Sequence, residues 1–272
     1  MAAEVTVATF NLHGGVDAWG RPFDAVRAIV DLGADLLLLQ EVWTTAGEPS
    51  AAAQVAELIG GSVHEVSMAT GRRAKPHPSA PPRWRRHRAR LDGDHALYLE
   101  SERPLDPRLA RSDRYRDATP GSLGLAIVTA LPVTSTAVIH LERLRRDRVA
   151  RALLVVTVLL GEVELTVVCT HMGHLSHGSP LHFSRLRREL TTMGGPSRPM
   201  VVAGDMNLWG PGVRLQLPGW RRAVKGPTWP SWRPHSQLDH LLVSRPLVVI
   251  GGRVVDERAS DHRPVLARLR LR

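Results

Sequence analysis

The sequence feature that most constrains the fold is a continuous apolar run at residues 34–43, ADLLLLQEVW. A run of this length fits a strand, and a strand without polar alternation is buried on both faces. The chain must therefore build a sheet that is covered on both sides. Apolar and β-branched patterns predict further strands at 4–10, 124–129, 150–160, 163–170, 199–204, 238–243 and 263–271.

Helical spacing of apolar residues predicts helices at 22–33, 50–60 and 181–193. Neighbouring strands are joined both by a hairpin at Gly161-Glu162 and by helical crossovers, which favours mixed sheets covered by helices, an α/β (α+β) fold class. A chain of 272 residues with 43% hydrophobic content can bury a sizeable core. We expect a single domain over 1–272.

The positive charge is concentrated in one segment. The formal net charge is +10, and residues 72–90 hold eight arginine and lysine residues without an acid. Together with several prolines and few large apolar residues, this predicts a long, partly disordered insertion at about 70–120. The basic run is typical either of a segment that follows phosphates or of a solvated tether.

Several sequence features bear on location. No stretch of about 18 apolar residues occurs, so no membrane span is expected. The N-terminus runs straight into a strand pattern without a secretory signal, and the single cysteine, Cys169, excludes an internal disulfide. We therefore expect a cytoplasmic protein, and a monomer.

Polar residues stand where the predicted strands begin or end, and strand ends commonly hold functional groups rigidly beside solvent. Each of them alone is also compatible with ordinary turn chemistry. These residues are Asn11, Glu41, His171, Asp205, Asn207, Asp239, Asp261 and His262.

The motifs around these residues resemble the endonuclease/exonuclease/phosphatase superfamily, and they occur in order along nearly the whole chain. They are TFNLHGG (9–15), LLLLQEVW (36–43), GLAIVTALPV (124–133), CTHMGH (169–174), AGDMNLWG (203–210), QLDHLLVS (237–244) and ASDHRPV (259–265). The resemblance implies a four-layer sandwich of two mixed β-sheets flanked by helices.

The resemblance also implies roles for the polar residues. Glu41 would bind the divalent metal with Asn11 beside it, and Asp261 would lie near that metal. Asp205 would orient or deprotonate the attacking water, and Asn207 would hold the water or the phosphate. His262 would contact the phosphate with its ring fixed by Asp239, and His171 would contact the phosphate or assist the leaving group.

The chemistry of phosphate esters calls for such a set independently. An anionic phosphodiester repels nucleophiles, so a cation must neutralise charge in the transition state. Mg²⁺ prefers oxygen ligands and uses one or two carboxylates, and Mn²⁺ accepts the same ligands. A histidine held by a carboxylate has a fixed tautomer and a raised pKa. We therefore expect a Mg²⁺-dependent hydrolase of phosphate esters, with Mn²⁺ as a substitute.

The substrate class stays open between three hypotheses. The first is a phosphodiesterase acting on DNA by in-line attack of water. The second is a hydrolase of a small phosphate ester or a phospholipid headgroup. The third is a polyanion-binding protein without catalysis. His171 stands where abasic-site endonucleases tend to have tyrosine, which weakens a DNA-repair interpretation.

Three further features have two interpretations each. His13 stands where some family members have an acid that assists the metal. His174, His177 and His182 near His171 are typical of solvated loop residues, with a metal cluster as the alternative. Trp229 and Trp232 either pack a loop or stack on a base or sugar.

Overall fold

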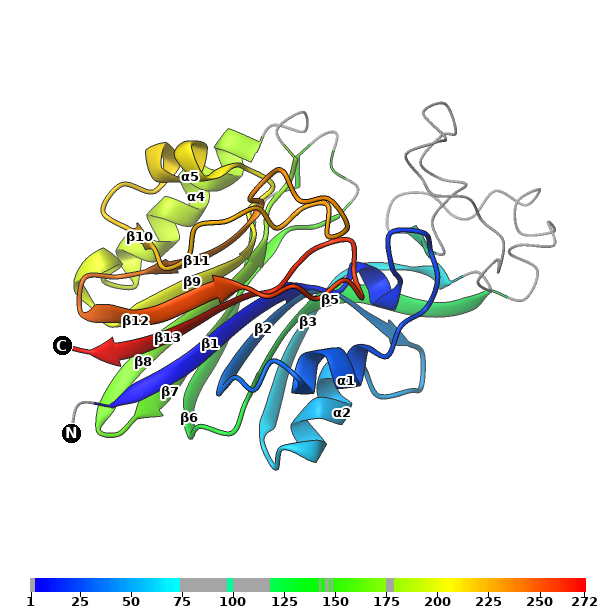
Figure 1. The fold of residues 1–272 in the computed structure, drawn as a ribbon, viewed down its shortest axis with the longest axis horizontal. Coiled ribbons are helices and arrows are strands. Elements are labelled where there is room, and N and C mark those ends of the chain that lie inside the picture. Colours follow the sequence, from blue (N-terminus) through cyan, green and yellow to red (C-terminus); the bar gives the residue numbers. More distant parts are fainter. Residues whose placement is uncertain are drawn as a thin grey trace.

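The structure is a computed structural model, and it describes residues 3–73, 97–99, 118–141, 143–144, 147, 149–174 and 179–272. Two β-sheets pack face to face, with helices on the outer side of each sheet (Figure 1). The four-layer α/β sandwich expected from the sequence is therefore confirmed.

The first sheet has seven strands in the order β12-β13-β1-β2-β5-β3-β4. β1 and β2 are parallel neighbours, whereas the other pairs are antiparallel. The strands are β1 (Glu4–Asn11), β2 (Leu36–Thr45), β3 (Ser62–Arg73), β4 (Leu97–Leu99), β5 (Thr119–Thr129), β12 (Leu247–Val254) and β13 (Val265–Leu271).

The second sheet has six strands in the order β10-β11-β9-β8-β7-β6, with β8 and β9 parallel. The strands are β6 (Val133–His140), β7 (Ala152–Leu160), β8 (Val163–His171), β9 (Met200–Asp205), β10 (Arg221–Arg222) and β11 (Asp239–Val243).

Helices α1 (Ala25–Val30) and α2 (Ala51–Leu58) cover the first sheet, and α4 (Ser179–Thr192) and α5 (Gly210–Gln216) cover the second (Figure 1). Short 3-10 helices lie at η1 (His13–Gly15) and η4 (Gly195–Ser197). Side-chain caps fix where α1 and α2 begin, because Asp24 and Ser50 accept hydrogen bonds from backbone amides three residues further on.

The apolar run at 34–43 forms β2 and is buried on both faces, as its composition predicts. Leu36 and Leu38 pack into the core between the two sheets, while Leu37 and Leu39 pack under α1 and α2. Each fully buried leucine contributes about 1.5–3 kcal/mol. Successive leucines of β2 thus point to opposite faces of the sheet, so the strand takes part both in the core between the sheets and in the core beneath the helices.

The structure contains strands and a helix that the sequence patterns do not predict, namely β3, β4, β6, β10, β12 and α5. Strand β6 is rich in β-branched residues but mostly exposed at the edge of its sheet, and in β12 the Gly251-Gly252 pair interrupts the apolar run. Of the insertion predicted at about 70–120, β3 runs to Arg73, β4 spans 97–99 and β5 begins at Thr119. The rest of the insertion lies outside the described residues.

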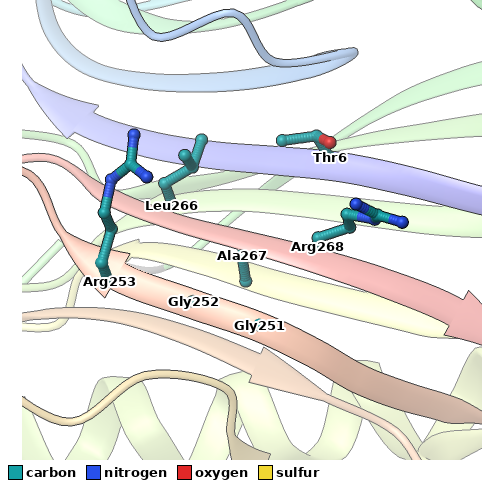
Figure 2. A pocket seen from close by; sticks show the side chains of 7 residues that line it. All are labelled: Thr6, Gly251, Gly252, Arg253, Leu266, Ala267 and Arg268. Atoms are coloured by element: carbon teal, nitrogen blue, oxygen red, sulfur yellow. The ribbon is translucent and has the colours of Figure 1, made fainter.

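A pocket of about 330 Å³ lies on the first sheet along β1, β12 and β13, and Figure 2 shows Thr6, Arg253 and Arg268 around it. None of the predicted site residues lines it. Thr6 is five residues from Asn11, or about 16 Å along an extended strand. Over the described ranges, no helix is both long and apolar enough to cross a membrane.

Candidate active site

Strand pairing brings the predicted polar residues to one edge of the sandwich. In the second sheet, His171 at the end of β8 is in register with Asp205 at the end of β9, and Asp205 is in register with Asp239 at the start of β11. In the first sheet, Asn11 ends β1 opposite Gln40 of β2. Because the two sheets pack face to face, the polar residues at the strand ends of one sheet lie opposite those of the other.

A close approach of β8 and β9 requires the glycine before Asp205. Gly204 has φ 148°, and a Cβ atom there would lie 1.8 Å from the backbone oxygen of Thr170. Any side chain at this position would push the two strands apart. The motif glycine therefore sets the spacing between His171 and Asp205.

Backbone strain is concentrated at the same edge. Among the described residues, the non-glycine residues with positive φ are His13, Glu41 and Asn207, at 47°, 50° and 47°. Glu41 lies at a β-bulge, where the pairing of β2 with β5 shifts between Gln40 and Val42. Strained residues of this kind persist where the surroundings hold them and are concentrated at functional sites. The bulge turns the Glu41 carboxylate toward the second sheet.

Asn11 links the carboxylates of the two sheets. Its side-chain amide Nδ2 donates to Asp205 Oδ2 at 3.1 Å and to Glu41 Oε1 at 3.3 Å. Its Oδ1 accepts the backbone N–H of His13 at 2.9 Å, which fixes the orientation of the amide. Asn11 is almost fully buried, so the link is rigid.

His262 and Asp239 form a buried pair. His262 Nδ1 lies 2.8 Å from Asp239 Oδ2, and His262 Nε2 lies 3.8 Å from Asp205 Oδ2 and 4.0 Å from Asp261 Oδ1. Burial disfavours the charged imidazolium, but Asp239, Asp261 and Asp205 together raise the pKa of His262 well above its ordinary value. The raised pKa favours the imidazolium form of His262, in which Nδ1 donates to Asp239 and Nε2 also carries a proton.

Asp205 lies at the centre of the cluster. Burial, with the neighbouring charges of Asp239 and Glu41, raises its pKa to about 7 despite the opposing effect of His262. The backbone N–H of Asn207 donates to Asp205 Oδ1 at 2.8 Å and holds the carboxyl group in place. A carboxyl group that titrates near neutrality can accept a proton from water.

His171 is held in its neutral form. Burial, followed by the charges of Arg151 and His262, lowers its pKa well below the ordinary value. Asn207 Nδ2 donates to the backbone oxygen of Met172 at 2.9 Å, and the same amide nitrogen lies 3.2 Å from His171 Nε2. Nε2 therefore accepts, and the proton is on Nδ1, 3.9 Å from Glu41 Oε1.

Asp261 lies at the edge of the cluster beside His13, whose Nδ1 is 3.5 Å from Asp261 Oδ1. All eight predicted site residues are thus linked by contacts of 4.0 Å or less. Within the described ranges, the ligand atoms of Asp205, Asp239 and His262 lie within 4.8 Å of one another, close enough to hold a metal ion. From the sequence, these three residues are expected to act in catalysis and not to bind the metal.

Two supporting groups were missed by the sequence analysis. Ser260 Oγ donates to the backbone oxygen of Asn11 at 2.7 Å and accepts the N–H of His262 at 3.2 Å, so it joins β1 to the last motif. Its place in the motif ASDH is a usable signal. Arg151 forms a buried ion pair with Asp147 and donates to the backbone oxygen of His171. No sequence pattern marks that pair.

The other aromatic and histidine residues have varied surroundings. His182 is fully buried in α4, so it is not solvated as expected, and His177 lies outside the described residues. Trp229 contacts His235, and the ring centroids of Trp232 and Trp19 are 5.3 Å apart. These contacts support the packing interpretation of both tryptophans.

The chain folds as a two-sheet α/β sandwich, and the cluster of eight polar residues at one edge contains carboxylates, amides and imidazoles. Side chains of these types can bind a divalent cation and contact an anionic ester. The sequence matches the endonuclease/exonuclease/phosphatase family over residues 8–262, and the chain belongs to that family, whose members are phosphoesterases that generally depend on a divalent metal. No curated protein matches the chain by sequence.

Three solved structures illustrate the shared fold. An endonuclease/exonuclease/phosphatase from Beutenbergia cavernae is similar with a TM-score of 0.65 and 22% identity, covering 99% of this chain and 72% of that chain. The human Nocturnin catalytic domain with bound sulfate has a TM-score of 0.62 and 15% identity, covering 99% and 94%. D. rerio TDP2 complexed with single-strand DNA product has a TM-score of 0.59 and 14% identity, covering 98% of both chains.

Proposed function

We propose that this phosphoesterase is a Mg²⁺-dependent phosphodiesterase that hydrolyses DNA by in-line attack of water. The observation that carries the proposal is the convergence of eight polar side chains from distant motifs into one connected cluster. The bound single-strand DNA product of the similarly folded D. rerio TDP2 supports a nucleic-acid substrate.

The donor set fits a hard divalent cation. Glu41 offers a partly exposed carboxylate beside Asp205, and Asp261 offers another at the edge of the cluster. Oxygen ligands of this kind suit Mg²⁺ or Mn²⁺. The alternative group of Asp205, Asp239 and His262 fits less well, because His262 Nδ1 already pairs with Asp239 Oδ2 at 2.8 Å and Mg²⁺ prefers oxygen ligands to imidazole. Glu41 is therefore the proposed metal ligand, with Asn11 and Asp261 beside it.

A bound cation would neutralise charge on the phosphate as the transition state forms. Asp205 then orients the attacking water and takes its proton, and Asn207 helps to hold that water or the phosphate. His262, kept protonated by Asp239, donates to a non-bridging phosphate oxygen. Neutral His171 faces the same space and contacts the phosphate or the leaving group.

A second candidate is hydrolysis of a small phosphate ester or a phospholipid headgroup, because one fold serves different substrates. The observation that keeps it open is that the eight residues of the cluster offer contacts for a phosphate and a cation alone, and these contacts are the same for a small ester and for DNA. A polyanion-binding protein without catalysis is disfavoured, because each position of the site keeps a side chain that can carry out its proposed role.

A substrate panel tests the proposal. Plasmid DNA, RNA and bis(4-nitrophenyl) phosphate are incubated with Mg²⁺ or Mn²⁺ and three proteins: wild type, Asp205→Asn, and the control Asp256→Asn at an exposed carboxylate. We expect DNA cleavage by the wild type and the control, reduced at least about 100-fold in Asp205→Asn. Turnover of the small diester without cleavage of DNA or RNA would support the second candidate. Binding of DNA without turnover of any substrate would support the third.

A further inference from the structure

Arg73 has no anionic partner among the residues that the structure describes. It ends strand β3, and its Nε and Nη2 atoms are buried and have no hydrogen-bond partner within the structure as described. Burial lowers the pKa of Arg73 to about 10, so the side chain is still charged at neutral pH. A buried charge without a partner is unfavourable and persists where something else requires it.

The guanidinium group is held in one place by Trp43. Its Cζ atom lies 5.2 Å from the centroid of the Trp43 ring, a cation–π distance. The indole itself is fixed, because its Nε1 donates to Thr45 and its ring packs on Gly121 of β5. A Cβ atom at Gly121 would lie 2.5 Å from the Trp43 ring, so only glycine leaves room for it.

This platform is connected to the candidate active site through two short stretches of chain. Trp43 follows Glu41 by two residues on β2, and the ideal Cβ position of Gly15 is 3.6 Å from Arg73 Nη2. Gly15 follows His13 by two residues, a reach of about 7 Å at most, and His13 contacts Asp261. Arg73 therefore lies near the catalytic cluster without contacting any residue of it through a described hydrogen bond or ion pair.

Planar guanidinium groups match phosphate oxygens, and arginine stacked on an aromatic ring is preorganised for such binding. Nη1 is not among the buried nitrogens of Arg73, and the side chain as a whole is only partly buried, so a phosphate approaches the group from the Nη1 side. A nucleic acid strand carries successive phosphates, one per about 3.4 Å of helix rise. A cation outside the catalytic cluster can therefore hold a phosphate of the same strand other than the one that is cleaved. A small diester has no second phosphate to offer.

We propose that Arg73, held on Trp43, binds a non-scissile phosphate of an oligonucleotide substrate. The proposal rests on the nucleic-acid function proposed above. It assigns one defined role within the basic run at 72–90, of which Arg73 is a part.

The test measures binding, so that it does not depend on turnover. In an Asp205→Asn background, binding of a fluorescent single-stranded oligodeoxynucleotide is followed by anisotropy at several salt concentrations. Adding Arg73→Gln is expected to weaken binding about 10-fold and to reduce the slope of log affinity against log salt by about 0.7, the value for one phosphate contact on a single strand. Arg187→Gln, which removes an exposed charge on α4, is the matched control and should change neither quantity by as much.

Two further measurements separate this role from a structural one. Because Arg73→Gln removes both an unpaired, partly buried charge and its contact with Trp43, the two effects oppose one another and its Tm should stay close to that of the parent. Arg73→Lys should retain part of the affinity. In the otherwise wild-type enzyme, kcat/KM for bis(4-nitrophenyl) phosphate should change less than twofold. The proposal would be overturned if Arg73→Gln left oligonucleotide binding unchanged, or if Arg187→Gln weakened binding as much as Arg73→Gln does. It would also be overturned if the Asp205→Asn parent bound no oligonucleotide, or if Arg73→Gln lowered kcat/KM for the small diester as much as it weakens oligonucleotide binding. If the wild type turned over none of the substrates but Arg73→Gln still weakened oligonucleotide binding, only the proposed function would be overturned.

Discussion

Replacing Arg151 by methionine should destabilise the protein strongly. Arg151 Nε and Nη2 donate to the two oxygens of Asp147 at 2.7 and 3.2 Å, and Nη1 donates to the backbone oxygen of His171 at 3.3 Å. The side chains of Arg151 and Asp147 are only 9% and 3% exposed. Among the described residues, the substitution leaves the buried Asp147 carboxylate with one hydrogen bond, from the N–H of Val149.

The magnitude follows from that uncompensated charge. Breaking a buried ion pair by removing one partner costs about 3–5 kcal/mol, whereas replacing both partners by apolar residues is often nearly neutral. Domains are stable by about 5–15 kcal/mol in total. The single variant should therefore lose a large part of the free energy of unfolding, and Arg151→Met with Asp147→Leu should recover most of it.

Urea unfolding of the wild type, both single variants and the double variant at pH 7 measures these differences as a double-mutant cycle. The reasoning is refuted if Arg151→Met lies within about 1 kcal/mol of the wild type, or if the double variant is no more stable than Arg151→Met. The pKa of His171 should also rise in Arg151→Met, because the Arg151 charge lowers it, and NMR titration of the ring protons reports this directly.

Two further predictions concern pH. Burial lowers the pKa of His240 to about 4, so from pH 6.5 down to pH 4 the unfolded chain binds a proton that the folded chain does not, and stability falls by about 3 kcal/mol over that window. Between pH 7 and pH 5, urea unfolding should show a loss about 2 kcal/mol larger in the wild type than in His240→Gln, and equal losses would contradict the burial argument. Asp239→Asn should lower the pKa of His262, since Asp239 is the largest cause that raises it, so the fall of kcat/KM at high pH should move to lower pH. A profile identical to that of the wild type would argue against a protonated His262 in the reaction.

The sequence predicts the covered sheets and the order of most strands because both depend on local patterns. The run at 34–43 fits a strand buried on both faces, and most of it lies in β2. Strand β6 was missed because it is exposed at a sheet edge and shows no apolar alternation. Helix α5 was missed because its seven residues include two glycines and a proline.

By itself, the sequence indicated the eight polar residues of the candidate site, because each stands in a motif at a strand end and the seven motifs follow one another in a fixed order. Only the tertiary structure decided how these residues act on one another. The strained bulge at Glu41, the protonated state of His262 and the neutral His171 depend on burial and on charges from other strands. Arg73 and Trp43 lie 30 positions apart, and the pairing of strands alone makes them neighbours. Such through-space energies are set by distance and desolvation, which the linear order of residues does not contain.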